Sequence, residues 1–454
     1  MKSVLRWLFV FLMAIIVPAC GGGSNPKGPS TLAAPPTSLV AGVGSTARIN
    51  LTWVDNSDNE FEFRIERAEA LAGPYFPIAV VPMNTQDYID IGLQPNKQYF
   101  YRVTAWNSLG NSASVGPASA TTNSLTWTTV SMSGTLMVGR GEHSAIYDSV
   151  GLRMLVFGGT DDSLNVLNEL RALNLNNDPI PATPWSTPAT TGTAPQRFGH
   201  SAIYDEANNR MVVFGGQDEN FVVINKVHIL DLATMAWSEV VPTGTAPVER
   251  AYHTAVYDSA NQRMIVCGGL DSLIAPLDDV HFLSLPAAGS LSWSTAVLNP
   301  KPIARSRHSA VYDALGGRMV AFGGSDQNPG LDGSTLNNET WSLAAGPIPS
   351  WDPLFPVGPP SYRMGHSSIW DAANRRMVTF GGTVTTAPST TRELWAMSLN
   401  AVPVWTNLGL TGGSAPANRS GHTAVYDSVR RRMIIYGGLD DNSATISDAW
   451  VIKL

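Results

Sequence analysis

Residues capable of acid–base chemistry recur in this sequence at fixed spacings. Six histidines each follow an arginine by three positions and precede an aspartate by five. The arginines are Arg140, Arg197, Arg250, Arg305, Arg363 and Arg419, and the histidines are His143, His200, His253, His308, His366 and His422. A histidine near a carboxylate could act as a general base or hold a metal ion. Because an active site needs one constellation, residues shared by every copy of a repeat are better explained by structure, and we predict no catalytic residue.

Other chemical sites are not indicated outside this repeat. The sequence has no separate Ser/His/Asp set, zinc-ligand spacing or glycine-rich phosphate loop. Segment 326–333 carries oxygen-bearing side chains at alternate positions, as calcium loops do, but Asn337 stands where such a loop needs glutamate. We therefore interpret this segment as a turn and predict neither a metal site nor a cofactor.

The recurring residues belong to a longer repeat that predicts β-structure. Six copies share the frame R-x-x-H-[ST]-[AS]-[IV]-[YW]-D-x4-R-M-x-x-[FCY]-G-G, and successive histidines are 53 to 58 residues apart. Each copy predicts two short strands joined by a tight turn, with apolar or small residues on both faces. The aspartate and arginine of D-x4-R, such as Asp148 and Arg153, bracket this turn, and we expect them to pair across it. Strands of this kind pack well when several sheets stack around an axis, and the small residue two positions after each histidine suits the innermost strand.

The repeat resembles that of the kelch family over residues 123–454. The glycine pair, the third-strand segments such as 168–170 and 338–341, and a later tryptophan all match. The resemblance implies an all-β fold, a six-bladed β-propeller with four short strands in each blade.

A tryptophan follows each of the first five copies but not the sixth. These residues are Trp185, Trp237, Trp293, Trp351 and Trp405. Trp127 stands 16 residues before His143, which matches the spacing between the other tryptophans and the next histidine. We therefore predict that a strand at 125–130 completes the last blade, so that backbone pairing joins the two ends of the propeller.

Some kelch propellers are enzymes, notably the copper oxidases related to galactose oxidase, whose cofactor needs a cysteine cross-linked to a tyrosine near the axis. The one propeller cysteine, Cys267, holds the usual aromatic position before a glycine pair, so we interpret it as a core residue. A non-enzymatic binding role is favoured, and a secreted carbohydrate-active enzyme, an oxidase or a hydrolase, is the alternative.

Function is expected where the blades differ, which is in the loops after the glycine pairs. These loops share one end of the array with the Arg-x-x-His segments. Arg197, Arg363 and Arg419 fit the R-x-G frame that contacts acidic peptides in kelch adaptors of animals. The candidate ligand-binding residues are Arg197, Arg363, Arg419, Asp218, Asp326 and Asp440. The alternative, which we favour, is that the arginines are neutralised by the loop aspartates and by Glu169, Asp279, Glu339, Glu393 and Asp448.

The N-terminal third carries three further predicted segments. Residues 1–19 predict a signal peptide, because a membrane-spanning helix needs about 20 apolar residues and the apolar run here is shorter. Residues 17–21 (VPACG) resemble a bacterial lipobox, which implies a lipid on Cys20, although Pro18 departs from the common pattern. Residues 20–34 predict a flexible tether. Residues 35–122 resemble a fibronectin type III domain, with Trp53 and Tyr99 at its core positions.

Composition limits the partners and the location. A formal net charge of −7 with no basic stripe argues against nucleic-acid binding, and two cysteines in all allow no disulfide framework. We predict an extracytoplasmic binding or scaffold protein, anchored to the outer membrane of a bacterium through its lipid alone, with simple secretion as the alternative. Its expected partner is a protein or a glycan recognised by the variable loops.

Overall fold

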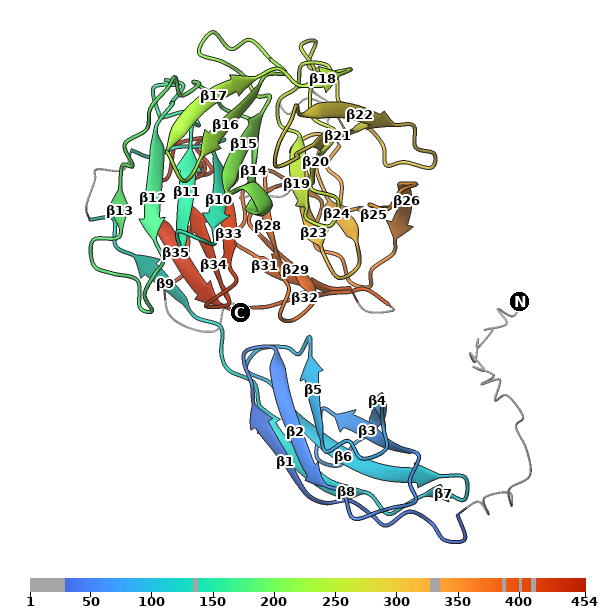
Figure 1. Ribbon diagram of the computed structural model, residues 1–454. Helices are drawn as coiled ribbons and strands as arrows, with labels where there is room; N and C mark the ends of the chain where they lie inside the picture. The colour runs from blue at the N-terminus through green and yellow to red at the C-terminus, as the bar shows by residue number, and fades with distance from the viewer. Residues whose placement is uncertain (1–28, 134–137, 327–334, 386–388, 400–401, 410–413) are drawn as a thin grey trace, which may run out of the picture. The chain divides into compact units, whose positions relative to one another are not determined.

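The computed structural model describes residues 29–133, 138–326, 335–385, 389–399, 402–409 and 414–454. The predicted signal peptide, Cys20 and most of the tether lie outside the described residues. The described part is all-β apart from one short 3-10 helix, η1 (Glu206–Asn208), and none of its helices could cross a membrane. Figure 1 shows the order of the strands along the chain.

The first eight strands form two sheets. They are β1 (Thr37–Val43), β2 (Arg48–Val54), β3 (Glu62–Ala68), β4 (Phe76–Pro82), β5 (Asp87–Ile91), β6 (Gln98–Asn107), β7 (Gly110–Asn111) and β8 (Val115–Thr121). One sheet has the order β1-β2-β5, and the other has the order β4-β3-β6-β7 with β8 also paired to β6. Trp53 is buried and packs against Phe63, with ring centroids 5.7 Å apart. The Tyr99 hydroxyl accepts a hydrogen bond of 3.0 Å from the N–H of Gln94, a few residues upstream.

Six sheets of four antiparallel strands follow, numbered 1 to 6 along the chain. Sheet 1 contains β10 (Ser144–Asp148), β11 (Arg153–Phe157), β12 (Leu170–Asn174) and β13 (Trp185–Ser186); sheet 2 contains β14 (Ser201–Asp205), β15 (Arg210–Phe214), β16 (Val227–Asp231) and β17 (Ala236–Val240); sheet 3 contains β19 (Thr254–Asp258), β20 (Arg263–Cys267), β21 (Val280–Ser284) and β22 (Ser292–Ala296). Sheet 4 contains β23 (Ser309–Asp313), β24 (Arg318–Phe322), β25 (Thr340–Ala344) and β26 (Ser350–Leu354); sheet 5 contains β28 (Ser367–Asp371), β29 (Arg376–Phe380), β31 (Leu394–Ser398) and β32 (Val404–Asn407); sheet 6 contains β33 (Thr423–Asp427), β34 (Arg432–Tyr436), β35 (Ala449–Lys453) and β9 (Trp127–Val130). The two-residue strand β18 (Thr243–Gly244) joins β22, and β27 (Arg363–Met364) pairs with β30 (Thr383–Val384).

The first strands of the six sheets surround one axis, as Figure 1 shows. Each contacts the first strands of the sheets before and after it, and β33 contacts β10. Small side chains such as Ala145, Ala202 and Ser368 line an axial channel of about 300 Å³, which explains why this position holds alanine or serine. Sheets stacked around an axis in this way form a β-propeller.

The turn between the first two strands of every sheet carries the same ion pair. Asp148 and Arg153 are opposite each other in the β10–β11 ladder, and the Arg153 Nε donates to the Asp148 carboxylate at 2.8 Å. The five equivalent pairs have distances of 2.7–3.1 Å. The prediction that D-x4-R residues pair across their turn is therefore confirmed.

The core lies between neighbouring sheets. Second strands are buried on both faces, as predicted, and the tryptophan of each outer strand packs against the preceding sheet. Trp237 of sheet 2, for example, packs on Phe157 of sheet 1 at 4.7 Å between ring centroids. Cys267 is buried in the same cluster as Trp351, and burial raises the pKa of its thiol to about 12, so it is a core residue.

Strand β9 joins the two ends of the array. It pairs antiparallel with β35, with Trp127 opposite Ile452 and Val130 opposite Ala449, as the sequence predicts. The Trp127 ring lies 5.2 Å from Phe380 of sheet 5, and Trp185 lies 5.1 Å from Tyr436 of sheet 6. Trp127 thus occupies the position that the sixth copy of the repeat leaves empty.

Removing β9 should destabilise the array. We expect a variant that begins at Ser131 to lose about 3–5 kcal/mol of unfolding free energy, because a buried tryptophan is lost and the β35 edge is exposed. A variant that begins at Asn123 keeps β9 and should unfold like the parent propeller. Chemical unfolding followed by fluorescence distinguishes the two, and equal transition midpoints would disprove the shared sheet.

Candidate functional site

One end of the axis is formed by the Arg-x-x-His segments and the loops after the glycine pairs, and we call it the mouth. Backbone hydrogen bonds of 2.8–2.9 Å join neighbouring sheets there, from the second glycine of each pair to the carbonyl of the next arginine. Gly159, which donates to Arg197, has φ +93°, and a Cβ on it would lie 2.6 Å from the carbonyl oxygen of Gly141. The glycine pair is thus needed for this close approach.

A second circle of backbone hydrogen bonds lies at the axis itself. The residue before each histidine donates its N–H to the carbonyl of its counterpart in the preceding sheet, at 2.7–3.0 Å. The donor–acceptor pairs are Glu142 to Gly421, Gly199 to Glu142, Tyr252 to Gly199, Arg307 to Tyr252, Gly365 to Arg307 and Gly421 to Gly365. These bonds form a closed circle that includes all six sheets.

The six histidines join neighbouring sheets. In five of them, Nε2 lies 2.7–2.9 Å from a serine or threonine hydroxyl of the preceding sheet, for example 2.8 Å from Ser144 for His200. His366 differs, because Ser309 is hydrogen-bonded to Ser368 instead. Burial lowers the pKa of His200 and of His308 to about 3, and it lowers the pKa of the other four well below the usual value. These rings are therefore neutral at pH 7, and their contacts support the structural interpretation.

Five of the six arginines form ion pairs with the acid that immediately precedes the third strand of the same sheet. The pairs are Arg140–Glu169, Arg250–Asp279, Arg305–Glu339, Arg363–Glu393 and Arg419–Asp448, at 2.6–3.1 Å. The arginine side chains are at most 2% exposed, whereas the acidic side chains are 31–46% exposed. Each of these arginines also donates to the first carbonyl of a glycine pair at 3.0–3.1 Å. Arg363 and Arg419, two of the candidate ligand-binding residues, are therefore engaged within the chain.

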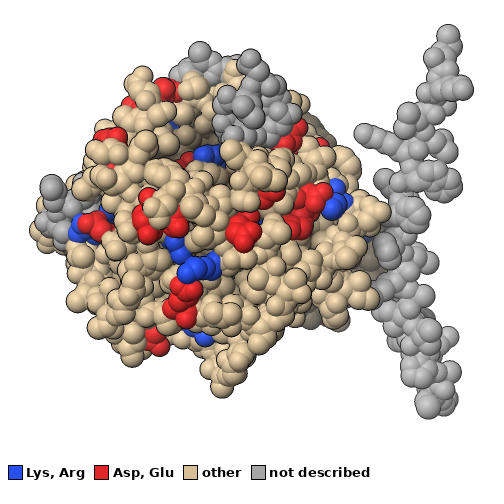
Figure 2. All heavy atoms as spheres, turned by 90° about the horizontal axis from the view of Figure 1, so that it is seen from above, with Lys and Arg blue, Asp and Glu red and all other residues tan. Residues whose placement is uncertain are grey.

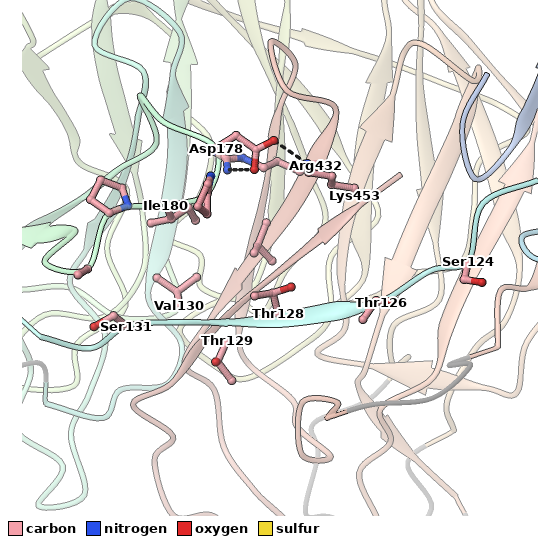
Figure 3. Close-up of a pocket in the computed structure, with 14 residues that line it drawn as sticks. Ser124, Thr126, Thr128, Thr129, Val130, Ser131, Asp178, Ile180, Arg432 and Lys453 are labelled. Atoms are coloured by element: carbon pink, nitrogen blue, oxygen red, sulfur yellow. Dashed lines mark ion pairs between the residues drawn. The ribbon is translucent and has the colours of Figure 1, made fainter. Parts of the chain in front are cut away.

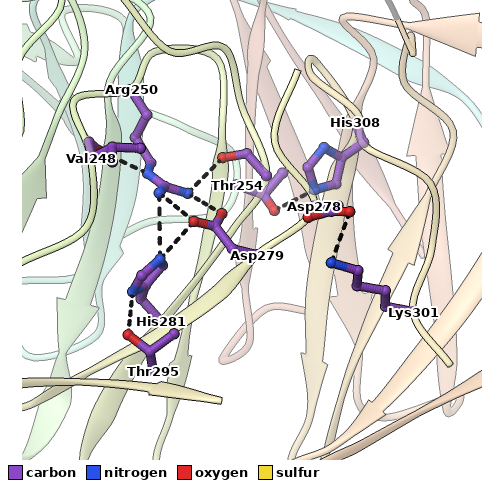
Figure 4. Close-up of polar contacts among 10 residues, drawn as sticks. Val248, Arg250, Thr254, Asp278, Asp279, His281, Thr295, Lys301 and His308 are labelled. Carbon is purple, nitrogen blue, oxygen red and sulfur yellow. Dashed lines mark hydrogen bonds and ion pairs between the residues drawn. The ribbon is translucent and has the colours of Figure 1, made fainter. Parts of the chain in front are cut away.

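Figure 4 shows this arrangement in sheet 3. Both terminal nitrogens of Arg250 contact Asp279, which also lies 2.7 Å from His281 Nε2. His281 Nδ1 lies 2.9 Å from the Thr295 hydroxyl on the outer strand. Burial would raise the pKa of Asp279, but the hydrogen bonds from Arg250 and His281 hold it well below its usual range.

The candidate aspartates hold their own loops instead of facing the arginines. Asp218 Oδ1 accepts the N–H groups of Asn220 and Val222. Asp440 Oδ1 accepts those of Asn442 and Ala444 in the same way, and Asp326 accepts the N–H of Thr335. The sequence placed these carboxylates at the mouth but did not show that the local backbone uses them.

Arg197 is the exception in the arginine circle. It is only 5% exposed, yet it forms no ion pair within the described residues, and its Nε has no hydrogen-bond partner there. Its NH1 donates to the carbonyl of the neighbouring Gln196 at 2.9 Å, not to a glycine. The position of the paired acid is occupied in sheet 2 by Lys226, which reaches Glu239 on the outer strand at 3.1 Å.

Three side chains at the axis have no counterpart in the other sheets. Glu142, Tyr252 and Arg307 have φ of 53–57°, a left-handed conformation that glycine provides in the remaining three sheets. Arg307 pairs with Glu142, and its guanidinium lies 3.8 Å from the centroid of the Tyr252 ring. With the histidines they line a pocket of about 120 Å³. Sequence reasoning missed this group, although the second variable position of the R-x-x-H frame was the available signal.

The loops at the mouth expose apolar tips in sheets 1 to 3. The tip residues are Leu164, Phe221, Val222, Leu273 and Ile274, which are 50–84% exposed. The equivalent loop of sheet 6 carries the polar Asn442 and Ser443 instead. In Figure 2, lysine and arginine atoms lie in small groups beside acidic ones, and most of the visible surface is uncharged. The apolar tips are therefore a feature of particular sheets, not of the repeat.

A larger cavity of about 500 Å³ lies beside β9, and Figure 3 shows Thr126, Thr128 and Thr129 among the residues that line it. Its charged groups are already paired, because Asp178 contacts Lys453 at 2.6 Å and Arg432 at 3.9 Å. No group of three or more His, Cys, Asp or Glu side chains in the described part of the chain could hold a metal ion.

Comparison with known proteins agrees with this geometry. The chain is 32% identical over 165 residues to acyl-CoA-binding domain-containing protein 4 of Arabidopsis thaliana. The matched region covers 36% of this chain and 24% of that protein. It is 26% identical over 367 residues to putative adagio-like protein 2 of Oryza sativa subsp. japonica. This match covers 78% of this chain and 54% of that protein. The chain thus spans about a quarter to a half of the length of these curated relatives.

A solved structure titled "Structure of YjhT" superimposes with a TM-score of 0.53 at 15% identity, covering 70% of this chain and 95% of that one, which shows the likeness of fold alone. The family model "KLHDC2/KLHL20/DRC7 Kelch-repeats domain" matches residues 117–287 and 277–454, most of the chain and all six sheets. With the frame, the four-stranded sheets and the mouth described above, this match shows that the chain belongs to the kelch-repeat family.

Proposed function

We propose that this protein is a non-enzymatic binding module whose mouth docks a protein partner. Kelch-repeat domains generally mediate protein–protein interaction. The observation that carries the proposal is that departures from the repeat gather at one end of the axis. There the chain accepts three left-handed side chains, each at a cost of about 1–2 kcal/mol, and exposes apolar loop tips of the kind that mark interaction sites.

We further propose that the six sheets are the blades of a six-bladed propeller. The closed circle of backbone hydrogen bonds and the β9–β35 pairing support this count. For the N-terminal strands we propose a fibronectin type III-like sandwich, supported by the buried Trp53 and by the hydrogen bond between the Tyr99 hydroxyl and the upstream backbone. Its role would be that of a spacer between anchor and propeller.

The proposed anchor is a lipid on Cys20, followed by a tether, which would place the propeller outside the cytoplasm at the outer membrane. We expect mass spectrometry of the N-terminal peptide from native cells to show a diacylglyceryl Cys20 as the first residue. An unmodified N-terminus downstream of Cys20 would instead identify a secreted protein.

Photo-crosslinking tests the docking face. Benzoyl-phenylalanine at Phe221 or Leu273, on the mouth loops, should capture the same partner protein in native cells. The same group at Val150 or Val429 is the matched control, because these exposed residues lie in the turns at the opposite end of the first strands. Equal capture from both ends, or capture from neither, would refute the proposal.

The axial side chains should matter for binding more than for stability. Replacing Glu142 and Arg307 together by glycine removes both charges of the pair and gives these positions the residue found in sheets 2, 5 and 6. We expect the unfolding free energy to change by no more than about 1 kcal/mol, because relief of the left-handed conformation offsets the lost contacts. Capture by the Phe221 crosslinker should fall. A large loss of stability with unchanged capture would show that the pair is structural.

A further inference from the structure

The loop between the third and outer strands of sheet 1 departs from the repeat. It comprises residues 175–184, which are ten residues between β12 and β13, whereas the equivalent loops of sheets 2 to 5 have four to seven residues. Asp178 lies in this loop and contacts Lys453 of sheet 6, with 2.6 Å between Oδ2 and Nζ. Because function is expected where the sheets differ, the added length needs an explanation beyond the shared fold.

Closure of the array does not explain this loop. The pairing of β9 with β35 already joins the two ends. The side chains of Asp178 and Lys453 are 38% and 65% exposed, and an ion pair so exposed to water contributes little stability. The loop instead forms one wall of the cavity of about 500 Å³ beside β9, a volume within the range of about 300–1,000 Å³ that is usual for small-molecule sites.

The opposite wall is formed by β9 and β35. Thr128 is opposite Val451 in their ladder, and both residues line the cavity. Thr126 lies two residues before Thr128, so its side chain points to the same face of the sheet. Figure 3 shows the two threonines along β9, with Asp178 and Ile180 across the cavity from them. Both threonines are exposed, so their hydroxyl groups can donate hydrogen bonds to a ligand and accept them from it.

The charges at the cavity favour a neutral polar ligand. Asp178 neutralises Lys453, and the Arg432 Nε donates to the Asp427 carboxylate at 2.8 Å. The hydrogen bond from Lys453 lowers the pKa of Asp178, so its carboxylate is ionised at pH 7. Its Oδ1 lies 3.9 Å from Arg432, beyond hydrogen-bond distance, and can accept hydrogen bonds from a ligand. Ile180 adds apolar surface. A carboxylate and hydroxyl groups beside apolar surface suit a ring that carries outward hydroxyl groups and C–H faces.

We propose that the cavity between β9 and the 175–184 loop binds a neutral sugar ring. Asp178 accepts hydrogen bonds from hydroxyl groups of the sugar, Thr126 and Thr128 bind further hydroxyl groups, and Ile180 contacts a C–H face. This site is separate from the mouth and does not rest on the docking of a protein there. The ring is either a free monosaccharide or one unit of a glycan chain.

Titration of the full chain with defined sugars tests the proposal. The probes are the methyl glycosides of glucose, galactose, mannose and N-acetylglucosamine, together with the disaccharides cellobiose, maltose, lactose and chitobiose. Saturation-transfer NMR and calorimetry should show that at least one methyl glycoside binds with a millimolar dissociation constant. A disaccharide that binds at least tenfold more tightly would identify a glycan chain as the source, and equal affinities would identify a single sugar. Binding of none of these probes would overturn the proposal.

Two variants locate the site. Asp178→Asn removes the charge and Thr128→Val removes a hydroxyl group at nearly constant volume, so each should weaken sugar binding at least tenfold. Thr406→Val is the matched control, because Thr406 follows the outer tryptophan of sheet 5 as Thr128 follows that of sheet 6, and its affinity should equal that of the parent.

Stability and docking are measured in the same variants. All three should keep thermal midpoints within about 2 °C of the parent, because the changes are at the surface. Capture by the Phe221 crosslinker should not change, so sugar binding and docking at the mouth are tested separately. Unchanged sugar binding in Asp178→Asn and Thr128→Val, or an equal loss in Thr406→Val, would refute the site. A large fall in the midpoint of Asp178→Asn without loss of sugar binding would show that the loop only fastens the array.

Discussion

Acidification from pH 7 to pH 4 should unfold the propeller in a single steep transition. The six mouth histidines are buried and neutral, and burial lowers the pKa of His200 and His308 to about 3. In the unfolded chain the same rings have pKa values of about 6.5. Because the folded-state pKa is depressed, stability is complete above pH 6.5 and is lost as the pH falls below it.

The magnitude follows from the number of rings. Below pH 5.5, each histidine lowers the unfolding free energy by about 1.4 kcal/mol for each pH unit of acidification. Six histidines together lower it by about 8 kcal/mol per pH unit. A domain with a total stability of about 5–15 kcal/mol should therefore unfold within one or two pH units, with a midpoint between about pH 4 and 6. Tryptophan fluorescence and circular dichroism against pH would measure this transition.

A variant with one ring fewer is the control for this prediction. His366→Gln removes a histidine whose ring nitrogens have no hydrogen-bond partner among the described residues, so its neutral form is the easiest to replace. Unfolding of this variant should take up about one proton fewer than unfolding of the parent. The slope of its unfolding free energy against pH should therefore be smaller by about 1.4 kcal/mol per pH unit. If the parent keeps its full stability down to pH 4, the histidines are not buried neutral groups.

Replacing Arg419 by alanine should lower the unfolding free energy by about 3–5 kcal/mol. The change leaves the Gly437 carbonyl without its buried donor and creates a cavity where a fully buried side chain stood. Asp448 is 41% exposed and partly solvated, so it adds a smaller share of the cost. Urea unfolding of the parent and the variant would measure the difference.

Arg197→Ala provides the matched comparison. Arg197 has no acid partner within the described residues and no bond to the glycine pair, so its removal should cost clearly less than that of Arg419. Arg419→Ala with a thermal midpoint within a degree or two of the parent would contradict the buried ion pair. Equal losses for both variants would mean that packing, not pairing, determines the cost.

The features that sequence predicted best are those that occur six times. Asp148 and Arg153 have the same pairing in every sheet, so the repeated spacing of their types is enough to identify it. Trp127 was placed in the last sheet because the other tryptophans define the spacing that it completes. Repetition thus supplies several independent observations of one environment, and a single sequence becomes informative.

Contacts that occur once could not be predicted in this way. Glu142 and Arg307 belong to different sheets, and only the closed circle of strands brings them together at the axis. The loop aspartates accept hydrogen bonds from local N–H groups, and the sequence could not show whether they would pair with these groups or with arginines, because that depends on backbone geometry. The sequence shows that Lys226 stands where the other five sheets have an acid. It does not show that Arg197 is buried, so it could not predict a buried arginine without an acidic partner.

The pairing of β9 with β35 also bears on how this protein is made. Val130 is synthesised long before its partner Ala449, and at about 5–20 residues per second the delay amounts to tens of seconds. Throughout translation β9 lacks its partner strand β35, while sheets 1 to 5 can already assemble. Residues 127–130 are thus the part of the nascent chain that is exposed longest to pairing with a wrong strand, and a chaperone that shields them would act before the last sheet exists.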